Sequence, residues 1–150
     1  MVVLIVSFIV SLTDFILKNH LKNNLFQSLP VIKDVFHITI VFNTGAAFGI
    51  LNNKNCFLVC ISVIFIIFLL IIISRDNEKN FLIKLSYGLI LGGALSNLFD
   101  RILYGYVIDY LDFQIWPVFN LSDACITIGV SLIILQSIKQ RKNEKRIPGN

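Results

Sequence analysis

Charged residues are scarce in this chain of 150 residues, where Asp, Glu, Lys and Arg together make up only 15%. Apolar residues make up 56%, whereas a soluble domain has about 45–50% even when glycine is counted. The mean hydropathy is +0.80. A soluble chain of this length buries only about two-thirds of the surface that it exposes when unfolded. The composition therefore excludes a soluble enzyme and a disordered protein, and indicates one integral membrane domain over residues 1–150.

Histidine and cysteine are also rare. His20 and His37 lie apart from any cysteine and from any serine-bearing nucleophile motif, which argues against a Ser–His or Cys–His catalyst. The 3 cysteines are an odd number in apolar runs, so neither a disulfide framework nor a metal site is expected. We interpret Cys56, Cys60 and Cys125 as small buried hydrophobic residues. No glycine-rich phosphate-binding loop is present.

Four apolar stretches are long enough to cross a bilayer, whose core needs about 20 helical residues. They are residues 1–19, 56–73, 81–99 and 119–138. The first stretch lacks the basic start and the small-residue cleavage site of a signal peptide, so we expect it to persist as a helix. The sequence therefore predicts an all-α polytopic membrane protein with four transmembrane helices.

The basic residues favour a cytoplasmic location for both termini, because Lys and Arg accumulate on that side. The tail 139–150 directly follows an apolar stretch and is rich in Lys and Arg, and the short loop 74–80 contains Arg75 and Lys79. The net charge is +4, but no aromatic residues interleave with the tail as a surface for single-stranded nucleic acid would require. Nucleic acid is therefore not an expected partner.

Two further segments, residues 20–55 and 100–118, are expected on the outer side. Apolar residues alternate over Phe36–Phe42, a period of two that predicts a half-buried strand in a small extracytoplasmic β-strand platform. Asn43 and Gly45 then end the strand. Residues 46–51 predict a short interfacial helix.

The second outer segment is rich in aromatic residues of the kind that prefer the membrane interface. These are Tyr104, Tyr106, Tyr110 and Trp116. Asp109 and Asp112 lie among them.

The polar residues of the spans fall at one end of the predicted bundle. They are Asp14, Lys18, Asn97, Asn120 and Asp123. Ionisable residues inside spans are costly and usually mark a functional site. We therefore expect a site on the extracytoplasmic side, built by several helices at one depth.

Two carboxyl groups could carry chemistry there. Asp109 precedes Asp123 by fourteen residues, and the connection can fold back on the helix that contains Asp123. Two such groups in a half-dry site share a proton, so one can activate water while the other protonates a carbonyl oxygen, as in aspartic peptidases. The alternative is helix capping, with Asn120 or Ser122 as the cap and Asp123 as a first-turn acid.

Other pairs leave alternatives open. Asn97 and Arg101 share a helix face and can present an amide and a guanidinium to a ligand, unless Arg101 simply pairs with Asp100. Asp14 and Lys18 are spaced to form a bracing ion pair. A further stripe of small residues predicts close helix packing. It consists of Gly88, Gly92 and Ser96.

Five motifs occur in a definite order along nearly the whole chain. They are Asp14 with Lys18, residues 43–48 (NTGAAF), 92–101 (GGALSNLFDR), 105–110 (GYVIDY) and 119–123 (FNLSD). In these motifs and their spacing the sequence resembles the bacterial lipoprotein signal peptidases, also called signal peptidase II.

The resemblance implies a membrane aspartic endopeptidase that cleaves prolipoproteins just before a cysteine carrying diacylglycerol. It implies that Asp109 and Asp123 are the catalytic dyad. From the physics of the site we expect Asn120 to hold Asp123 by a hydrogen bond. The supporting residues that the resemblance implies are Asn43, Gly45, Asn97, Arg101, Asn120, Asp14 and Lys18. It further implies no metal or organic cofactor, inhibition by the cyclic peptide globomycin, a multi-pass location in the bacterial inner membrane, and a monomer in contact with membrane lipid.

The chain departs from the family pattern at three positions: Ser96 stands where Gly is common, Ser122 where Ala is common, and Leu17 where Ser or Thr is common. These changes bear on local packing. Two rival hypotheses remain: a small proton-coupled transporter or channel subunit that uses the acids as a relay, and a non-catalytic membrane partner whose acids only cap helices.

Overall fold

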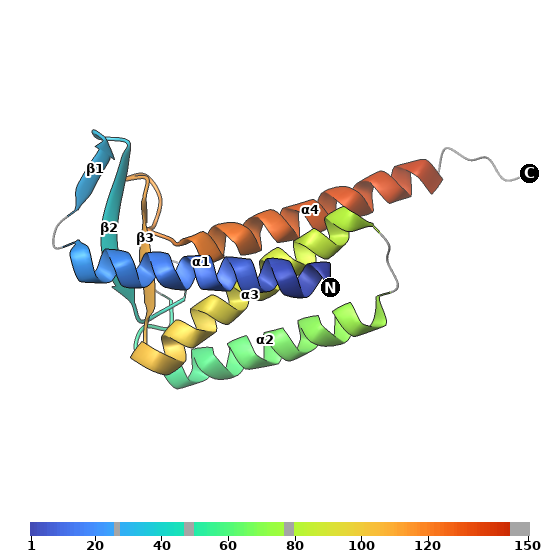
Figure 1. Ribbon diagram of the computed structural model, residues 1–150, viewed down its shortest axis with the longest axis horizontal. Helices are drawn as coiled ribbons and strands as arrows, with labels where there is room; N and C mark the ends of the chain where they lie inside the picture. The colour runs from blue at the N-terminus through green and yellow to red at the C-terminus, as the bar shows by residue number, and fades with distance from the viewer. Residues whose placement is uncertain (26–27, 47–49, 77–79, 145–150) are drawn as a thin grey trace, which may run out of the picture.

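The computed structural model describes residues 1–25, 28–46, 50–76 and 80–144, which form a bundle of helices with a small sheet at one end (Figure 1). The elements, in chain order, are α1 (Val2–Asn24), β1 (Leu29–Ile32), β2 (Phe36–Asn43), α2 (Asn55–Arg75), α3 (Phe81–Tyr104), β3 (Val107–Asp112) and α4 (Leu121–Glu144).

Four of these helices are long and apolar enough to cross a membrane. The shortest, α2, has 21 residues, which at about 1.5 Å per residue spans the roughly 30 Å of a bilayer core. The predicted four-helix membrane fold is confirmed. Each helix is longer than its predicted stretch; α1, for example, continues to Asn24 and α3 to Tyr104.

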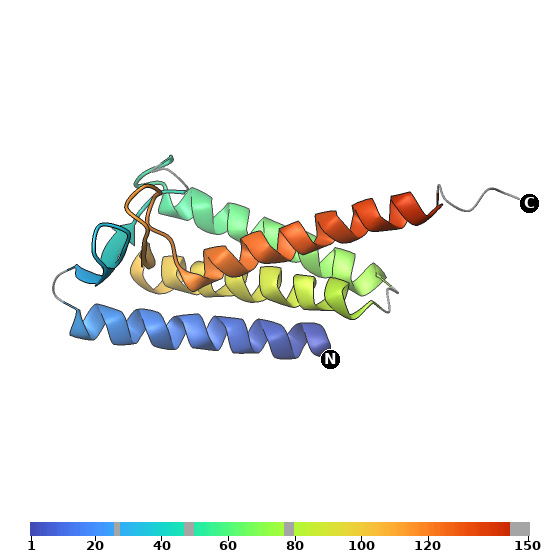
Figure 2. The same cartoon turned by 90° about the horizontal axis from the view of Figure 1, so that it is seen from above.

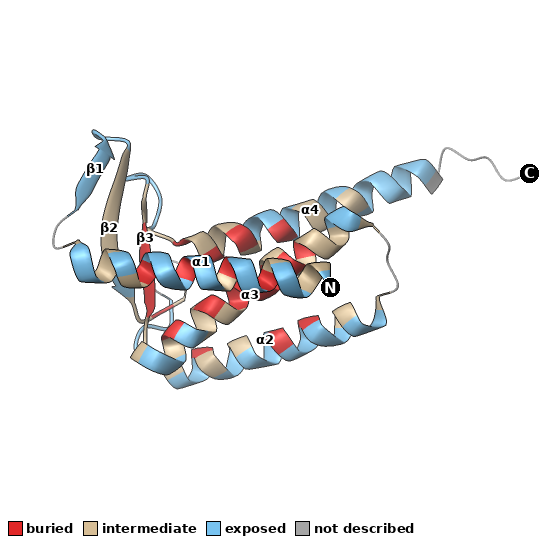
Figure 3. Cartoon of the chain, viewed as in Figure 1, coloured by how far each residue is buried: buried red, intermediate tan, exposed pale blue. Residues whose placement is uncertain are grey.

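The centre of the bundle is α3. Half of the residues in its most apolar part are buried, whereas at most 22% are buried in the corresponding part of each of the other three spans. The buried residues gather along α3 and β3 (Figure 3). α3 contacts α1, α2 and α4. The remaining surface of the outer helices is apolar and exposed, as expected for helices that face lipid.

Small residues bring α1 and α4 close to α3. A methyl group added at Gly92 would lie 2.7 Å from the carbonyl oxygen of Ser7 on α1, and one added at Gly93 would lie 2.5 Å from that of Ser122 on α4. Both distances are shorter than non-bonded atoms tolerate, so only glycine permits these two approaches. The predicted small-residue stripe thus packs against α1, and the adjacent Gly93 packs against α4.

The three strands form an antiparallel sheet in the order β1-β2-β3. The predicted strand is confirmed as β2, and its partners β1 and β3 were not predicted. Val41 pairs with Asp109 and Asn43 with Val107, which sets the end of β2 beside the start of β3. The register shifts between Ile38 and Val41. This sheet closes one end of the bundle.

Met1 and the end of α4 at Glu144 lie at the end of the bundle opposite the sheet (Figures 1 and 2). An even number of spans requires this arrangement, and it separates the basic end of α4 from the sheet. The short interfacial helix predicted at residues 46–51 lies partly outside the described residues, and Ile50–Asn53 form turns.

The cysteine interpretation is right for one residue and wrong for two. Cys125 is buried, whereas Cys56 and Cys60 are exposed. α2 buries only Leu58, Ile66 and Leu69, so the face that bears Cys56 and Cys60 points away from the bundle.

Candidate active site

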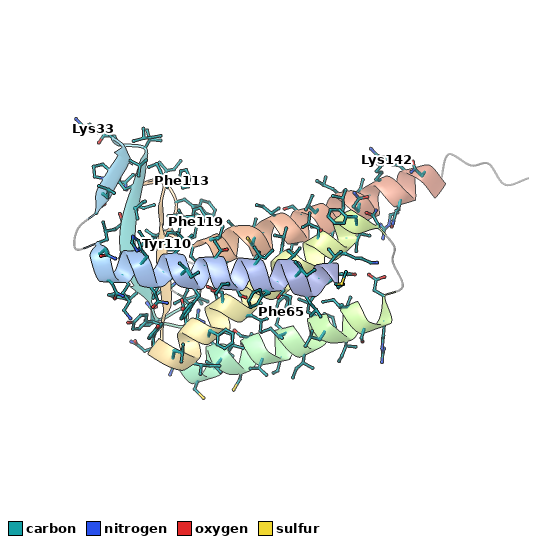
Figure 4. All side chains as sticks on the ribbon, viewed as in Figure 1. Lys33, Phe65, Tyr110, Phe113, Phe119 and Lys142 are labelled. Carbon is teal, nitrogen blue, oxygen red and sulfur yellow. The ribbon has the colours of Figure 1, made fainter. Side chains whose placement is uncertain are left out.

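The polar residues predicted to form a site come together where the sheet meets the bundle. Asp14 and Lys18 come from α1, Asn97 and Arg101 from α3, and Asp123 from α4. The strands supply Asn43 at the end of β2 and Asp109 in β3, and Asn120 precedes α4. Tyr110, labelled in Figure 4, lies at this same junction.

Asp109 is held by two amide groups. Its side chain is almost fully buried in β3, where Val107, Ile108 and Tyr110 are also buried. Asn43 Nδ2 donates to Asp109 Oδ2 at 2.9 Å, and Asn120 Nδ2 donates to Asp109 Oδ1 at 2.7 Å. Both oxygens therefore have a fixed donor.

Asp123 lies in the first turn of α4. Asn97 Nδ2 donates to Asp123 Oδ1 at 2.8 Å, and the backbone N–H of Asn120 lies 3.3 Å from Asp123 Oδ2. The backbone N–H of Asp123 in turn donates to Asn120 Oδ1 at 2.9 Å. Asn120 therefore caps α4, and the capping interpretation is right about this contact.

The hydrogen bond expected between Asn120 and Asp123 exists, but it runs through their backbone N–H groups. The amide nitrogen of Asn120 reaches Asp109 instead. One side chain thus contacts the carboxyl group of Asp109 and the backbone N–H of Asp123. Capping and site assembly are two effects of the same residue.

A cavity of about 840 Å³ opens onto both carboxyl groups. Its polar wall includes Asn43, Asn97, Arg101, Asp109 and Asp123. Its apolar wall includes Phe42, Trp116, Pro117, Val118, Phe119 and Ile126. A mostly apolar cavity with a few convergent polar groups is typical of a ligand site.

The environment changes the acidity of Asp109. Loss of hydration raises the pKa of its carboxyl group to about 7. The hydrogen bonds from Asn43 and Asn120 lower this pKa, and the charge of Asp123 raises it. A carboxyl group with a pKa near neutrality can exchange a proton under ordinary conditions, as a general acid or base must.

Arg101 and Gly45 join the two sides of the cavity. Arg101 Nη2 donates to the carbonyl oxygen of Gly45 at 2.7 Å, and the backbone N–H of Gly45 donates to Asn43 Oδ1 at 2.9 Å. Because that N–H can only donate, the oxygen of Asn43 faces Gly45 and its nitrogen faces Asp109. The second terminal nitrogen of Arg101 is buried without a partner among the described residues.

A buried ion cluster lies next to Asp109 and Asp123. Lys18 Nζ lies 2.7 Å from Asp14 Oδ2 and 2.9 Å from Asp100 Oδ2, so the predicted pair of Asp14 and Lys18 forms. The hydroxyls of Ser96 and Ser122 donate to Asp14 Oδ2 at 2.7 and 2.6 Å. We call Asp14, Lys18, Ser96, Asp100 and Ser122 the lysine cluster.

Two sequence-based interpretations are corrected here. Asp100 pairs with Lys18 and accepts from the backbone N–H of Ile108, so the alternative pair of Asp100 with Arg101 is wrong. Neighbouring residues diverge on a helix, which explains the difference. Tyr110 is only 4% exposed and is not an interface residue.

Tyr110 is instead a polar partner of the lysine cluster. Its hydroxyl donates to Asp14 Oδ1 at 2.9 Å. Burial raises the pKa of Tyr110 well above its usual range, and the charge of Asp14 raises it further. The hydroxyl therefore keeps its proton and stays a donor.

Sequence reasoning did not place Ser96, Asp100, Tyr110 or Ser122 in the site. Each is buried and polar, a combination that marks a partner within the fold. The available signal was the position of Ser96 and Asp100 on the helix that bears Asn97, and of Tyr110 and Ser122 beside the two acids.

The chain is similar to known proteins over most of its length. The family model for signal peptidase II matches residues 6–139. The chain is 48% identical to a lipoprotein signal peptidase of Halothermothrix orenii over 141 residues, which cover 94% of this chain and 95% of that protein. It is 41% identical to that of Moorella thermoacetica over 145 residues, covering 97% and 95%.

Two solved structures share this fold. A bacterial membrane enzyme solved at 2.3 Å aligns with a TM-score of 0.89 and 32% identity, covering 99% of this chain and 94% of its own. A second bacterial membrane enzyme, solved at 1.9 Å, aligns with a TM-score of 0.82 and 34% identity, covering 91% and 92%.

Proposed function

Since this chain belongs to the signal peptidase II family of membrane proteases, we propose that it removes signal peptides from diacylglyceryl-modified prolipoproteins by aspartic catalysis. Cleavage occurs just before the lipid-bearing cysteine. The observation that carries this proposal is the pair formed by Asp109 and Asp123, which Asn120 joins at the wall of one cavity. The comparisons give no support to a transporter.

The dyad works by sharing one proton. The ionised carboxylate removes a proton from water as the water oxygen attacks the scissile carbonyl carbon, and the protonated carboxyl group donates to the carbonyl oxygen. Collapse of the tetrahedral intermediate breaks the C–N bond, and a proton passes to the leaving amine. The pair titrates as a unit, so the two roles belong to the dyad jointly.

The other polar groups of the cavity hold the reacting parts. Asn43, Asn97 and Asn120 orient the two carboxyl groups. The unpartnered nitrogen of Arg101 can donate to a carbonyl group of the substrate backbone. No metal or organic cofactor takes part in this reaction, and one chain supplies every residue of the site, as a monomer requires.

The position of the site suits a substrate anchored in lipid. The cavity opens where the helices meet the sheet, and exposed apolar side chains such as Ile115 and Trp116 lie beside it. A lipid-bearing cysteine can enter from the bilayer while water reaches the dyad from outside. Both termini and the basic end of α4 then lie in the cytoplasm, and the site faces the outer side of the bacterial inner membrane.

The proposal is tested with purified protein and two forms of one prolipoprotein. We expect cleavage of the form that carries diacylglycerol, before its modified cysteine, and little cleavage of the unmodified form. Globomycin should block the reaction by filling the cavity. Equal cleavage of both forms would contradict the lipid specificity, and no cleavage of either would contradict the proposed function. Mass spectrometry of the products identifies the bond that is cut.

Asn43→Ala should move the acidic limb of the pH–rate profile to higher pH. The hydrogen bond from Asn43 lowers the pKa of Asp109, so its loss raises that pKa and reduces the ionised fraction at any pH near or below it. Activity should therefore fall more at pH 6 than at pH 8. Single-turnover rates across this range provide the measurement.

Asn52→Ala is the matched control for this experiment, because Asn52 lines the same cavity while the side-chain donors to Asp109 in the described chain are Asn43 and Asn120. Its acidic limb should coincide with that of the unmodified protein. An Asn43→Ala profile that coincides as well would refute the assigned hydrogen bond.

A further inference from the structure

Lys18 is close to the dyad without touching it. Its nitrogen is fully enclosed and contacts Asp14, Asp100 and Asn97 Oδ1, the last at 3.0 Å. None of the hydrogen bonds or ion pairs found among the described residues joins Lys18 to Asp109 or Asp123. Any effect of Lys18 on the reaction must therefore pass through a neighbour or through its charge.

The neighbour that connects Lys18 to the dyad is Asn97. An ammonium group has donors only, so the atom of Asn97 that faces Lys18 must be its oxygen. The same oxygen accepts from Asn120 Nδ2 at 3.1 Å. The amide nitrogen of Asn97 is thereby directed to Asp123 Oδ1, where it donates at 2.8 Å.

A flipped Asn97 amide would be unfavourable at every contact. Its NH2 group would meet the ammonium of Lys18 and the amide nitrogen of Asn120, and its oxygen would meet the carboxylate of Asp123. The positive charge of Lys18 thus selects the one orientation that supplies Asp123 with a donor.

The lysine cluster holds that charge in place from three helices. Asp14 and Lys18 belong to α1, Ser96 and Asp100 to α3, and Ser122 to α4. Asp14 Oδ2 accepts from Lys18 and from both serine hydroxyls at 2.6–2.7 Å. The two serines, at which this chain departs from the family pattern, give the carboxylate of Asp14 a fixed position between α3 and α4.

We infer that Lys18 is a positioning residue for the proteolytic reaction, because it fixes the amide of Asn97 toward Asp123. Ser96 and Ser122 hold Lys18 in place through their hydrogen bonds to Asp14. This inference rests on the proposed function, because it assigns the work of Lys18 to the same dyad. It assigns a functional part to two hydroxyl groups that lie outside the cavity.

A double-mutant cycle tests the inference, with kcat and KM measured on the lipid-modified substrate. Lys18→Met and Asn97→Ala should each lower kcat on the order of 10- to 100-fold, as loss of an outer orienting group does, with KM within about twofold. Because Lys18 acts through Asn97, the double variant should be no slower than Asn97→Ala alone. A double variant whose loss equals the product of the two single losses would overturn the inference.

Lys22→Met is the matched control, since Lys22 lies one turn further along α1 and stacks on the ring of Tyr104, 4.0 Å from its centroid. It loses the same charge and should keep the kcat of the unmodified protein. A loss equal to that of Lys18→Met would assign the effect to charge at this end of α1 and would contradict the inference.

The pH profile separates positioning from simple structural support. The charged groups around Lys18 are Asp14, Asp100, Asp109 and Asp123, contributed by α1, α3, β3 and α4, and Arg101 faces the dyad from α3. The charge of Lys18 lowers the pKa of Asp109. That direct effect of charge does not need Asn97, whereas positioning does. Lys18→Met and Asn97→Ala should therefore move the acidic limb of kcat to the same extent, because both remove the aligned donor to Asp123. A further shift when Lys18→Met is added to Asn97→Ala would contradict the inference.

A variant with no charge change covers the case in which Lys18→Met fails to fold. Ser96→Ala with Ser122→Ala removes two donors to Asp14 and should lower kcat several-fold. The triple variant that also has Asn97→Ala should be no slower than Asn97→Ala alone. Ser86→Ala is its control, because Ser86 is a buried serine of α3 that donates to its own helix at Leu82. Unchanged kcat in the double serine variant would overturn the part assigned to the serines.

These results separate the inference from the proposed function. Cleavage by the unmodified protein and its loss in Asp109→Asn test the function alone. If both hold while the cycle is multiplicative, the dyad stands and the role of Lys18 is wrong.

Discussion

Asp109→Asn should lower the rate of signal peptide cleavage by about 10³- to 10⁴-fold, the size of effect that removal of a general acid–base group produces. The amide cannot share a proton with Asp123, and its NH2 group would meet either Asn43 or Asn120, which both donate to this position. Asp123→Asn should cause a loss of the same order. The two losses should not multiply, because the carboxyl groups act as a unit. Single-turnover cleavage of the lipid-modified substrate provides the measurement.

Asp112→Asn is the matched control on the same strand. Asp112 Oδ1 accepts from the backbone N–H of Gln114 at 2.9 Å, a contact that the oxygen of an asparagine can keep. This variant should cleave at the rate of the unmodified protein. If either dyad variant did so while folded, as judged by its thermal unfolding, the assignment of the dyad would be wrong.

Gly93→Ala should lower kcat on the order of 100-fold, a loss that a displacement of about 1 Å at a catalytic group can produce. The added methyl group would lie 2.5 Å from the carbonyl oxygen of Ser122 and 2.8 Å from Ile126 Cγ1. The first turn of α4 must move to accommodate it, and Asp123 moves with that turn. Overpacking costs about 1–3 kcal/mol, which the better helix propensity of alanine offsets by about 1 kcal/mol.

Gly88→Ala is the matched control on the same helix. Its methyl group would meet the side chain of Val6 at 2.6 Å on the α1 side, away from α4. Gly88→Ala should lower the unfolding temperature to a similar extent and keep kcat near that of the unmodified protein. Equal kcat in the two variants would show that the position of the first turn of α4 does not limit the reaction.

The spans were predictable because their apolar stretches are long enough to cross a bilayer. Most of the site was predictable because polar residues inside a span cost free energy and usually mark a functional site. The structure brings the five polar residues found in this way together at one end of the bundle. They are Asp14, Lys18, Asn97, Asn120 and Asp123. Their shared depth follows from their places along the chain, in the second halves of α1 and α3 and at the start of α4. Their roles in catalysis remain proposals that the variants above test.

Two of the strands were not predictable from periodicity. β3 has a run of four buried residues, so the alternation that reveals a half-buried strand is absent. β1 has only four residues and contains Pro30, which argues against a strand in a sequence pattern. Both strands follow from pairing with β2, a tertiary contact that no local signal encodes.

The sequence also did not show which polar side chains pair with one another. Asp100 lies next to Arg101 in the sequence, yet it pairs with Lys18 of α1. Tyr110 was assigned to the interface because aromatic residues are common there, whereas its hydroxyl fits a buried carboxylate. Which face of a helix or strand is covered depends on how the elements pack, and composition does not specify that.

The hydrogen bond from Ser122 to Asp14 has a consequence for synthesis of the chain. It joins residues that are 108 positions apart, so the site cannot assemble until α4 has emerged from the ribosome and crossed the bilayer. Until then Asp14 can pair with Lys18 on its own helix, which lets α1 enter the membrane without a net charge at that depth. The protease is therefore inactive until α4 has been made and inserted.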